Sequence, residues 1–311
     1  MNRTSLRGLL AATLCWVLGT SSLLAWDPAG HMVIGQIAWE DLSPATRQKV
    51  SEILGTLPNQ YNNGQTYNFV TSGCWMDDMR AMPNYPWAKW HYVTIPWTPD
   101  GKQFALPSPP HVVWAIDSAL ANLREPGTSA EKRTEALAML IHFVQDVHQP
   151  LHATDRNNDR GGNGFLIANL QRTDNGPAKI ATLHYFWDAA YRLTATDDKV
   201  TEIWHCPPVP GRPSVPGEGI IAEEAGKIRA QFPKASLEEL RDPAKQNATE
   251  WARESHVAGC LFGYPAGQEP SDTELHVLPA DFVTHSRDIA VRRVAVAGYR
   301  LAAMLNALFD K

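Results

Sequence analysis

The sequence LIHFVQDVHQPLH, residues 140–152, combines two patterns from which the rest of the chain can be interpreted. His142 and Asp146 are four residues apart, so on a helix they lie one turn apart on the same face, where both can reach one metal ion. Pro150 ends the helix because proline lacks a backbone N–H and disfavours helical geometry in the preceding residue. The resulting turn brings His152 to the same place. The alternative is a surface hydrogen bond between the first two side chains and a histidine in a loop.

Helical patterns separated by proline- and glycine-containing loops cover most of the chain, which predicts a mainly α, multi-helix fold with long loops. Thr128 and Glu131 are expected to form a capping box at the start of the helix that carries His142. No long Ser/Gly or charge-rich linker divides the chain, so we expect a single domain over residues 26–311. Only short extended pieces, such as residues 90–95, interrupt the helices. Further helices are expected over residues 44–54, 69–82, 111–124, 183–193, 220–231, 243–259 and 281–309.

Residues 1–25 have the layout of a cleaved signal peptide. Arg3 and Arg7 precede an apolar run from Leu9 to Leu18, and small and apolar residues follow. We therefore expect an exported protein, periplasmic or secreted, whose mature chain starts at Trp26. No later run approaches the roughly 18 apolar residues of a membrane-spanning helix, so we expect no membrane span. An uncleaved anchor is the alternative.

Charge and cysteine content narrow the possible functions further. Removing residues 1–25 takes away two arginines and no acidic residue, which lowers the formal net charge from −5 to −7. Such a chain repels polyanions unless local cations outweigh its net charge.

The mature part keeps Cys74, Cys206 and Cys260, an odd number that permits at most one internal disulfide. Our preferred pair is Cys206 with Cys260.

Five shorter motifs carry similar chemistry. Each has a structural explanation when taken alone: a core histidine, a surface ion pair or a plain loop. LHYFWD, however, repeats the four-residue spacing with His184 and Asp188, and two separate helical His-x3-Asp pairs outweigh those explanations. The motifs are WDPAGH (26–31), CWMDDMR (74–80), WHY (90–92), DRGGN (159–163) and LHYFWD (183–188).

The order of these motifs resembles that of the exported, zinc-dependent, single-strand-specific S1/P1 nucleases of fungi, plants and bacteria, whose relatives include bacterial zinc phospholipases C. The resemblance runs from Trp26 to Asp188, and the central H-F-x2-D-x-H-Q-P-L-H motif is its most specific part. It implies a fold of the phospholipase C and single-strand nuclease type, a zinc-dependent nuclease domain over residues 26–311, and three zinc ions.

The resemblance also implies roles for individual residues. One zinc ion would be bound by Asp77, His91, His142 and Asp146, and a second by His152, His184 and Asp188. The third would be bound by the amine and carbonyl of Trp26, by His31 and by Asp146, which bridges two ions. Asp77, Arg80 and Asp146 would be catalytic, and Arg80, Thr94 and Asn163 would contact the substrate. The family has an acidic or amide residue where this chain has Thr94, so base preference stays open. His148 matches a motif residue that is not a ligand.

The chemistry of the candidate ligands agrees with this interpretation. They are imidazoles, carboxylates and main-chain groups without a thiolate, a set typical of catalytic zinc. A carboxylate-bridged zinc pair activates water for attack on phosphorus. The chemistry alone indicates phosphodiester hydrolysis, and the resemblance implies single-stranded DNA and RNA as substrates, 5'-phosphorylated products and 3'-nucleotidase activity. No stable protein partner is expected. A zinc-dependent phospholipase C and a non-catalytic exported zinc-binding protein are the alternatives, and Arg80 argues against the second. Residues 165–178 are expected to form an extra loop or lid.

Overall fold

The structure, a computed structural model, describes residues 26–60, 66–173, 178–201 and 218–310. The expected signal peptide lies outside these ranges. Within them the chain is mainly helical, which confirms the predicted fold class. The longer helices are α1 (Pro28–Asp41), α2 (Pro44–Leu54), α4 (Val112–Arg124), α5 (Ala130–Asp146), α7 (Glu218–Gln231), α8 (Ala248–Phe262) and α9 (Ala280–Phe309).

Short polar side chains cap several of these helices. Asp27 accepts a hydrogen bond from Gly30 N at the start of α1, and Ser43 accepts one from Thr46 N at the start of α2, as expected. In α5 the cap is Ser129, which accepts from Lys132 N, so the capping box predicted at Thr128 is wrong by one residue. Thr128 N instead donates to Glu125 O and closes the preceding turn.

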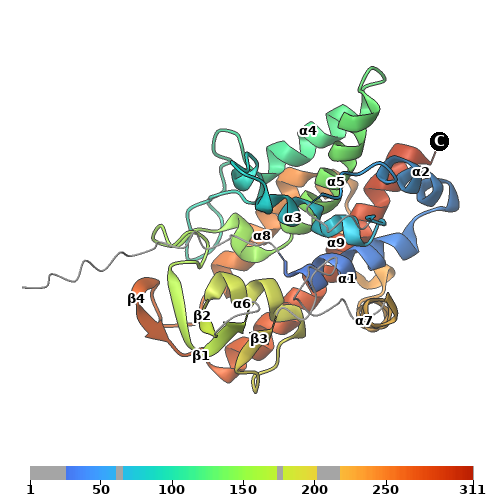
Figure 1. Ribbon diagram of the computed structural model, residues 1–311. Coiled ribbons are helices and arrows are strands. Elements are labelled where there is room, and N and C mark those ends of the chain that lie inside the picture. Colours follow the sequence, from blue (N-terminus) through green and yellow to red (C-terminus); the bar gives the residue numbers. More distant parts are fainter. Residues whose placement is uncertain (1–25, 61–65, 174–177, 202–217, 311) are drawn as a thin grey trace, which may run out of the picture.

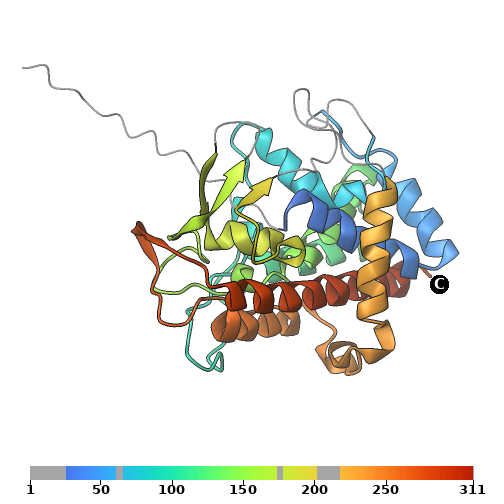
Figure 2. The same ribbon diagram turned by 90° about the horizontal axis from the view of Figure 1, so that it is seen from below.

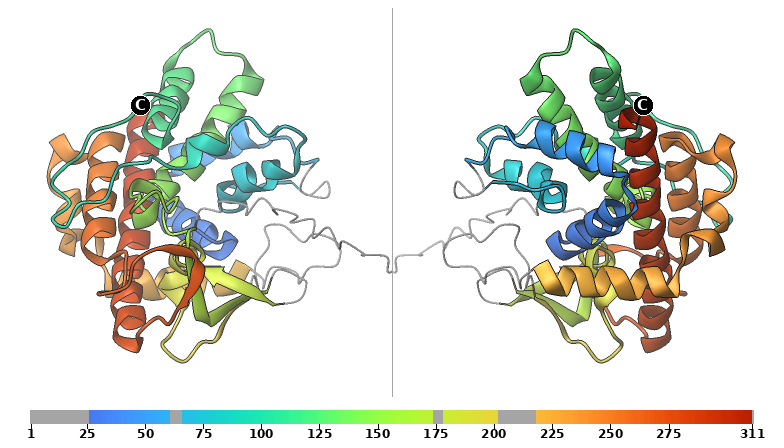
Figure 3. Two further views of the ribbon diagram at one scale, coloured as in Figure 1. Left: turned by 90° about the vertical axis from the view of Figure 1, so that its left-hand side faces the viewer. Right: turned by 90° about the vertical axis from the view of Figure 1, so that its right-hand side faces the viewer.

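α9, with 30 residues, runs the length of the molecule (Figures 1 and 2). Figure 3 shows α8 beside α9 on one side and α1 and α2 on the other. Gly298 permits the close approach of α1 and α9, because a Cβ at this position would lie 2.5 Å from Ile37 Cγ2. α5 lies near the middle of Figure 1, next to the single-turn helix α3 (Trp75–Asp78).

A small sheet lies near the beginning of α9 (Figure 2). β1 (Phe165–Thr173) pairs antiparallel with β2 (Lys179–Thr182), and β3 (Lys199–Thr201) and β4 (Ser271–His276) pair parallel with its other edge. The extra loop or lid expected over residues 165–178 is therefore wrong for residues 165–173, and residues 174–177 lie outside the described part of the chain. Buried Phe165 and Ile167 alternate with partly exposed Leu166, the pattern of a strand with one covered face. α6 (Leu183–Ala189) follows β2 directly.

Three predicted helices have different bounds. The helix expected over residues 69–82 is split into 3₁₀ turns at Thr71–Cys74 and Met79–Ala81 around α3, and Gly73 weakens its start. The one expected to reach residue 193 ends as α6 at Ala189, with a 3₁₀ turn after it. α8 begins at Ala248 rather than at residue 243, because Asn247 supplies its N-cap. The extended piece predicted from residue 90 begins after a 3₁₀ turn, Ala88–His91.

Two clusters of buried hydrophobic residues form the core. The first surrounds α1, α6, the sheet and α9, and the second surrounds α2, α4, α5 and α8. None of the described helices has the length and apolar run needed to cross a membrane. The expected Cys206–Cys260 disulfide is not confirmed, because Cys260 is a free thiol here and Cys206 lies outside the described residues.

Candidate metal centre

Eight imidazole and carboxylate side chains from separate elements meet where the two hydrophobic clusters adjoin. Among the described residues they form three groups whose ligand atoms lie within 4.8 Å of one another. The groups are His31, Asp77 and His142; His91, His142 and Asp146; and His152, His184 and Asp188.

The first centre is built on α5. Asp146 Oδ2 lies 3.0 Å from His91 Nδ1 and 3.0 Å from His142 Nε2, and those two nitrogens are 2.9 Å apart. Asp77 Oδ1 lies 3.8 Å from His91 Nδ1. Atoms bound to one tetrahedral zinc at about 2.0–2.1 Å are roughly 3.3 Å apart, so these four side chains fit one ion.

Asp146 also faces a second group of ligands. Its other oxygen, Oδ1, lies 3.6 Å from His31 Nε2, and Asp77 Oδ2 lies 3.6 Å from the same nitrogen. Both distances are too long for a hydrogen bond and suit atoms that share an ion. The two oxygens of Asp146 therefore point toward different groups, the arrangement that a bridging ligand needs.

The start of the expected mature chain lies between the metal groups. Trp26 is fully buried, and its indole N–H donates to Gln145 O at 3.0 Å. The next residue, Asp27, donates its backbone N–H to Asp188 O at 3.0 Å. The Asp27 carboxylate accepts from Arg192 Nε at 2.8 Å, which fixes this end of α1. The Trp26 indole thus contacts the main chain next to Asp146, and the main chain that follows Trp26 contacts that of Asp188.

The remaining group joins η4 (Pro150–Ala153) to α6. The rings of His152 and His184 stack with centroids 5.0 Å apart, and His184 Nε2 lies 3.9 Å from Asp188 Oδ1. The DRGGN loop supports this group. Gly161 has φ +62°, and a Cβ there would lie 2.5 Å from Leu151 O, so only glycine allows its carbonyl to reach His184.

Each histidine is oriented by a hydrogen bond at the nitrogen that faces away from the centre. His31 Nδ1 lies 2.6 Å from Gln145 Oε1, and the other Nδ1 atoms lie 2.7–2.8 Å from main-chain oxygens. An oxygen acceptor at Nδ1 places the hydrogen there and leaves the Nε2 lone pair for a metal. The pairs with main-chain oxygens are His142 with Gly73, His152 with His91, and His184 with Gly161.

His91 is reversed. Tyr85 Oη donates its only hydrogen to Met76 O at 3.0 Å, so at its 2.7 Å contact with His91 Nε2 it accepts. The hydrogen of His91 therefore sits on Nε2, and Nδ1 faces Asp146.

Unpartnered buried atoms test whether a metal fits. Within the described part of the chain, four atoms that face the centre have no hydrogen-bond partner, although native proteins satisfy the large majority of buried polar groups. Nitrogen and oxygen donors of this kind suit zinc. The four atoms are His31 Nε2, Asp146 Oδ1, His152 Nε2 and Asp188 Oδ2.

Burial also sets the charge states of these groups. It lowers the pKa of His91 and His152 well below the usual range, so both imidazoles bind a metal without first losing a proton. Burial raises the pKa of Asp146 and Asp188 well above the usual range, because desolvation outweighs the opposite effects of His31 and Arg80 on Asp146 and of the Gln149 hydrogen bond on Asp188. The site therefore attracts cations.

Arg80 and Asp77, three residues apart, face each other as an ion pair. Burial alone would raise the pKa of Asp77, but Arg80, His142 and His31 outweigh that effect and lower it. Arg80 Nε donates to Asp77 Oδ1 at 2.8 Å, and the buried NH2 of Arg80 has no partner among the described residues. A donor is thus available for an anion beside the metal groups.

Two of the three residues predicted to contact the substrate, Thr94 and Asn163, lie in different surroundings. Thr94 is exposed and lines a pocket of about 170 Å³ together with Asp155, Arg160 and the ligands His152 and His184. Asn163 instead donates Nδ2 to Arg160 O at 2.9 Å and shapes the loop. His148 lies away from the metal groups: its Nδ1 pairs with Val144 O at 2.7 Å.

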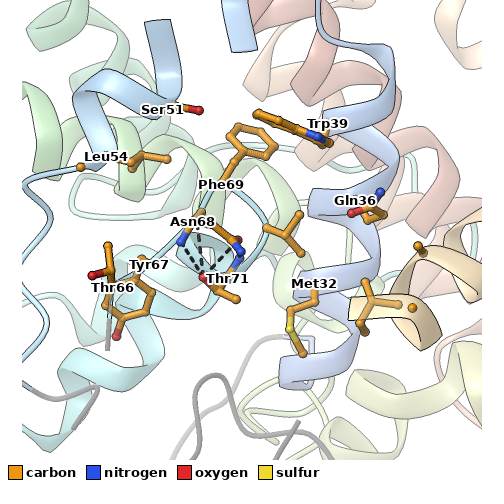
Figure 4. A pocket seen from close by; sticks show the side chains of 15 residues that line it. Met32, Gln36, Trp39, Ser51, Leu54, Thr66, Tyr67, Asn68, Phe69 and Thr71 are labelled. Atoms are coloured by element: carbon orange, nitrogen blue, oxygen red, sulfur yellow. Dashed lines mark hydrogen bonds between the residues drawn. The ribbon is translucent and has the colours of Figure 1, made fainter. Parts of the chain in front are cut away.

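A larger pocket, of about 680 Å³, lies between α1, α2 and residues 66–71 (Figure 4). Met32, Trp39 and Phe69 give it a largely apolar wall, and none of the described residues that line it is a histidine or carries a carboxylate. Its size alone would make it the default binding site, but the reactive groups gather at the smaller pocket.

Sequence reasoning missed the residues that orient the ligands. These residues are Gln145, which contacts His31, Tyr85, which contacts His91, and Gln149, whose Nε2 donates to Asp188 Oδ1 at 2.8 Å. Each is either far in sequence from its partner or separated from it by a spacing that no helix would bring together. Gln145 and Gln149 both stand inside the quoted central motif, and this position was the signal that the sequence offered.

Comparisons with known proteins agree with this geometry. The family model described as S1/P1 Nuclease matches residues 26–310. The chain is 26% identical to Endonuclease 2 of Arabidopsis thaliana, with 99% of each chain covered. It is 24% identical to Endonuclease 5 of the same plant, over 92% of this chain and 91% of the relative. It is also 24% identical to Nuclease P1 of Penicillium citrinum, over 90% of this chain and 97% of the relative.

Proposed function

The chain belongs to the S1/P1 nuclease family, and from this we propose that residues 26–311 form one domain that cleaves single-stranded DNA and RNA to 5'-phosphorylated products with three zinc ions. Nuclease activity, the hydrolysis of phosphodiester bonds, follows from the family and from the names of its relatives. Zinc dependence, single-strand specificity, 3'-nucleotidase activity and export after removal of residues 1–25 are parts of the proposal.

The position of Asp146 is the observation that carries the proposal. One of its oxygens lies 3.0 Å from two imidazole nitrogens, and the other faces His31 Nε2 at 3.6 Å. Zinc ions bound on both sides of such a carboxylate supply an activated water and offset the charge of the phosphate. We assign the zinc ligands as in the sequence analysis, with Trp26 and His31 beside Asp146.

Arg80 has the position of a phosphate clamp in this proposal. Asp77 holds its Nε, so the guanidinium is fixed in one orientation with its NH2 directed to neither Asp77 nor any other described partner. A buried guanidinium of this kind stabilises negative charge that develops on phosphorus oxygens. Together with bound cations it overcomes the net charge of −7 on the mature chain that would otherwise repel a polyanion.

The pocket beside His152 and His184 would hold the base next to the scissile phosphate. Thr94 and charged Asp155 and Arg160 line it. A pocket of about 170 Å³ with such groups suits a nucleobase better than the acyl chains of a phospholipid. This favours the nuclease over the phospholipase C alternative.

The test is a comparison of substrates with the processed chain starting at Trp26. Single-stranded DNA, RNA and 3'-AMP should be hydrolysed, duplex DNA should be cleaved far more slowly, and a phosphatidylcholine analogue should remain intact. Arg80→Ala should lose activity on every phosphodiester. Preferred hydrolysis of the phospholipid, or equal rates on single-stranded and duplex DNA, would contradict the proposal.

A further inference from the structure

Gln145 is a fully buried amide that stands between two metal-group residues, His142 and Asp146, on α5. Its Oε1 lies 2.6 Å from His31 Nδ1, which comes from α1, 114 positions away in sequence. Its main-chain oxygen accepts the indole N–H of Trp26 at 3.0 Å. One residue therefore contacts the His31 ring and the Trp26 indole, which belong to two residues expected at the third metal ion.

The direction of the amide decides which nitrogen of His31 can bind a metal. With Oε1 toward the ring, Nδ1 carries the hydrogen and the Nε2 lone pair points at Asp77 and Asp146, each 3.6 Å away. With the amide reversed, its NH2 would donate to Nδ1, and the hydrogen of the neutral ring would move to Nε2. That hydrogen would point at the cation and block binding.

The surroundings leave space for this amide and for little else. A Cβ on Gly73 would lie 3.0 Å from Gln145 Nε2 and 3.3 Å from Oε1, so the glycine makes room for the side chain. The Nε2 group has no hydrogen-bond partner among the described residues, although it is buried. Leaving a buried donor unpaired costs about 1–3 kcal/mol. The Nε2 group of this amide thus gains no hydrogen bond from its position. Among the described residues, the hydrogen bond of the Gln145 side chain is with His31.

We propose that Gln145 is a positioning residue for the metal ion at His31: it fixes His31 with Nε2 toward Asp77 and Asp146, and its main chain holds Trp26 at the same ion. This inference rests on the proposed zinc centre. Hydrogen-bond partners of ligating histidines typically change metal affinity by about 10-fold to 100-fold.

Gln145→Leu separates this role from simple packing, because leucine fills a similar volume but offers no acceptor to Nδ1. Gln145→Glu keeps an oxygen acceptor at the same place. Gln149→Leu is a matched control in the other group, because Gln149 is also buried on the same segment and donates to Asp188 Oδ1.

The experiment measures zinc site by site. Protein purified without chelator would be analysed for zinc content, and crystals would be examined by anomalous diffraction at the zinc edge. Gln145→Leu should lose the peak beside His31 while the peaks at His142 and His152 persist, and its affinity for that ion should fall about 10-fold to 100-fold. Gln145→Glu should keep all peaks, and Gln149→Leu should lose affinity at the His152 group instead.

Full occupancy beside His31 in Gln145→Leu would overturn the proposal, as would equal loss in Gln145→Glu. Should the leucine variant not fold, Gln145→Met, which also lacks a strong acceptor, gives the same comparison. A wild-type protein without zinc at any group would contradict the proposed function itself, whereas three peaks in the wild type and in Gln145→Leu would contradict only the role of Gln145.

Discussion

Replacing Asp146 by asparagine should damage the enzyme more than the same change at Asp188. The substitution keeps the size of the side chain but removes its charge and turns one oxygen into an NH2 group that cannot bind a cation. At Asp146 the two oxygens face different groups, 3.0 Å from His142 Nε2 and 3.6 Å from His31 Nε2. Asp188 belongs to one group only: its Oδ1 accepts from Gln149 and lies 3.9 Å from His184 Nε2, and its Oδ2 has no partner among the described residues.

The expected magnitudes follow from this difference. If each weakened ion contact costs at least about 10-fold to 100-fold, Asp188→Asn should retain roughly 1–10% of kcat/KM on single-stranded DNA. Asp146→Asn, which weakens two contacts, should retain about 1% or less. With zinc bound, Asp146→Asn should also lower the thermal stability. In chelator this loss should vanish or become a gain, because without a cation the buried carboxylate is less favourable than an amide.

The assay is cleavage of single-stranded DNA by both variants at equal zinc content, with thermal unfolding in zinc and in chelator. Equal activity of the two variants at equal zinc content would refute the bridging role of Asp146. A large loss of stability of Asp146→Asn in chelator would show that the carboxylate serves the fold rather than a metal.

Three further changes test other parts of the site. A methionine retained ahead of Trp26 removes the free amine as a ligand while leaving His31 in place. Such protein should hold less zinc and turn over more slowly than correctly processed protein. Equal zinc content and equal rates would exclude the amine as a ligand. Tyr85→Phe leaves the buried Nε2–H of His91 without its acceptor. Zinc affinity, measured by competition with a chelator, should therefore fall about 10-fold to 100-fold. Unchanged affinity would contradict the assignment of the His91 hydrogen to Nε2. Burial raises the pKa of Asp159 to about 6, from 3.8, so the stability this group contributes is full below pH 4 and is lost as the pH rises through about 6. Chemical unfolding in chelator should show the wild type losing stability relative to Asp159→Asn over that window, and parallel pH profiles would contradict the shift.

Two pairs of candidate ligands could be predicted from the sequence because helix geometry places a histidine and an aspartate four residues apart on one face. His142 with Asp146 and His184 with Asp188 were found in this way, and the structure brings each pair within 3.9 Å. The order of the motifs then placed His31 and Asp77 in the same centre, although no local pattern connects them.

The supporting groups could not be predicted, for two physical reasons. Several acceptors that orient the histidines are main-chain oxygens, such as Gly73 O and Gly161 O, and a carbonyl leaves no mark on residue type. Gln145 reaches His31, 114 positions away, only through the tertiary fold, and Tyr85 contacts His91 across six residues that follow no helical or strand spacing. β1 was missed because its alternation is interrupted by an irregularity between Ile167 and Gln171, so the period-2 signal is short.

Metal analysis combined with a chelator assay tests the central claim most directly. Protein that begins at Trp26 and is purified without chelator should contain about three zinc ions per chain, since three groups of ligands are available. Removal of the metal should abolish cleavage of single-stranded DNA, and added zinc should restore it. Phosphodiester cleavage that continues at full rate in metal-free protein would contradict the account.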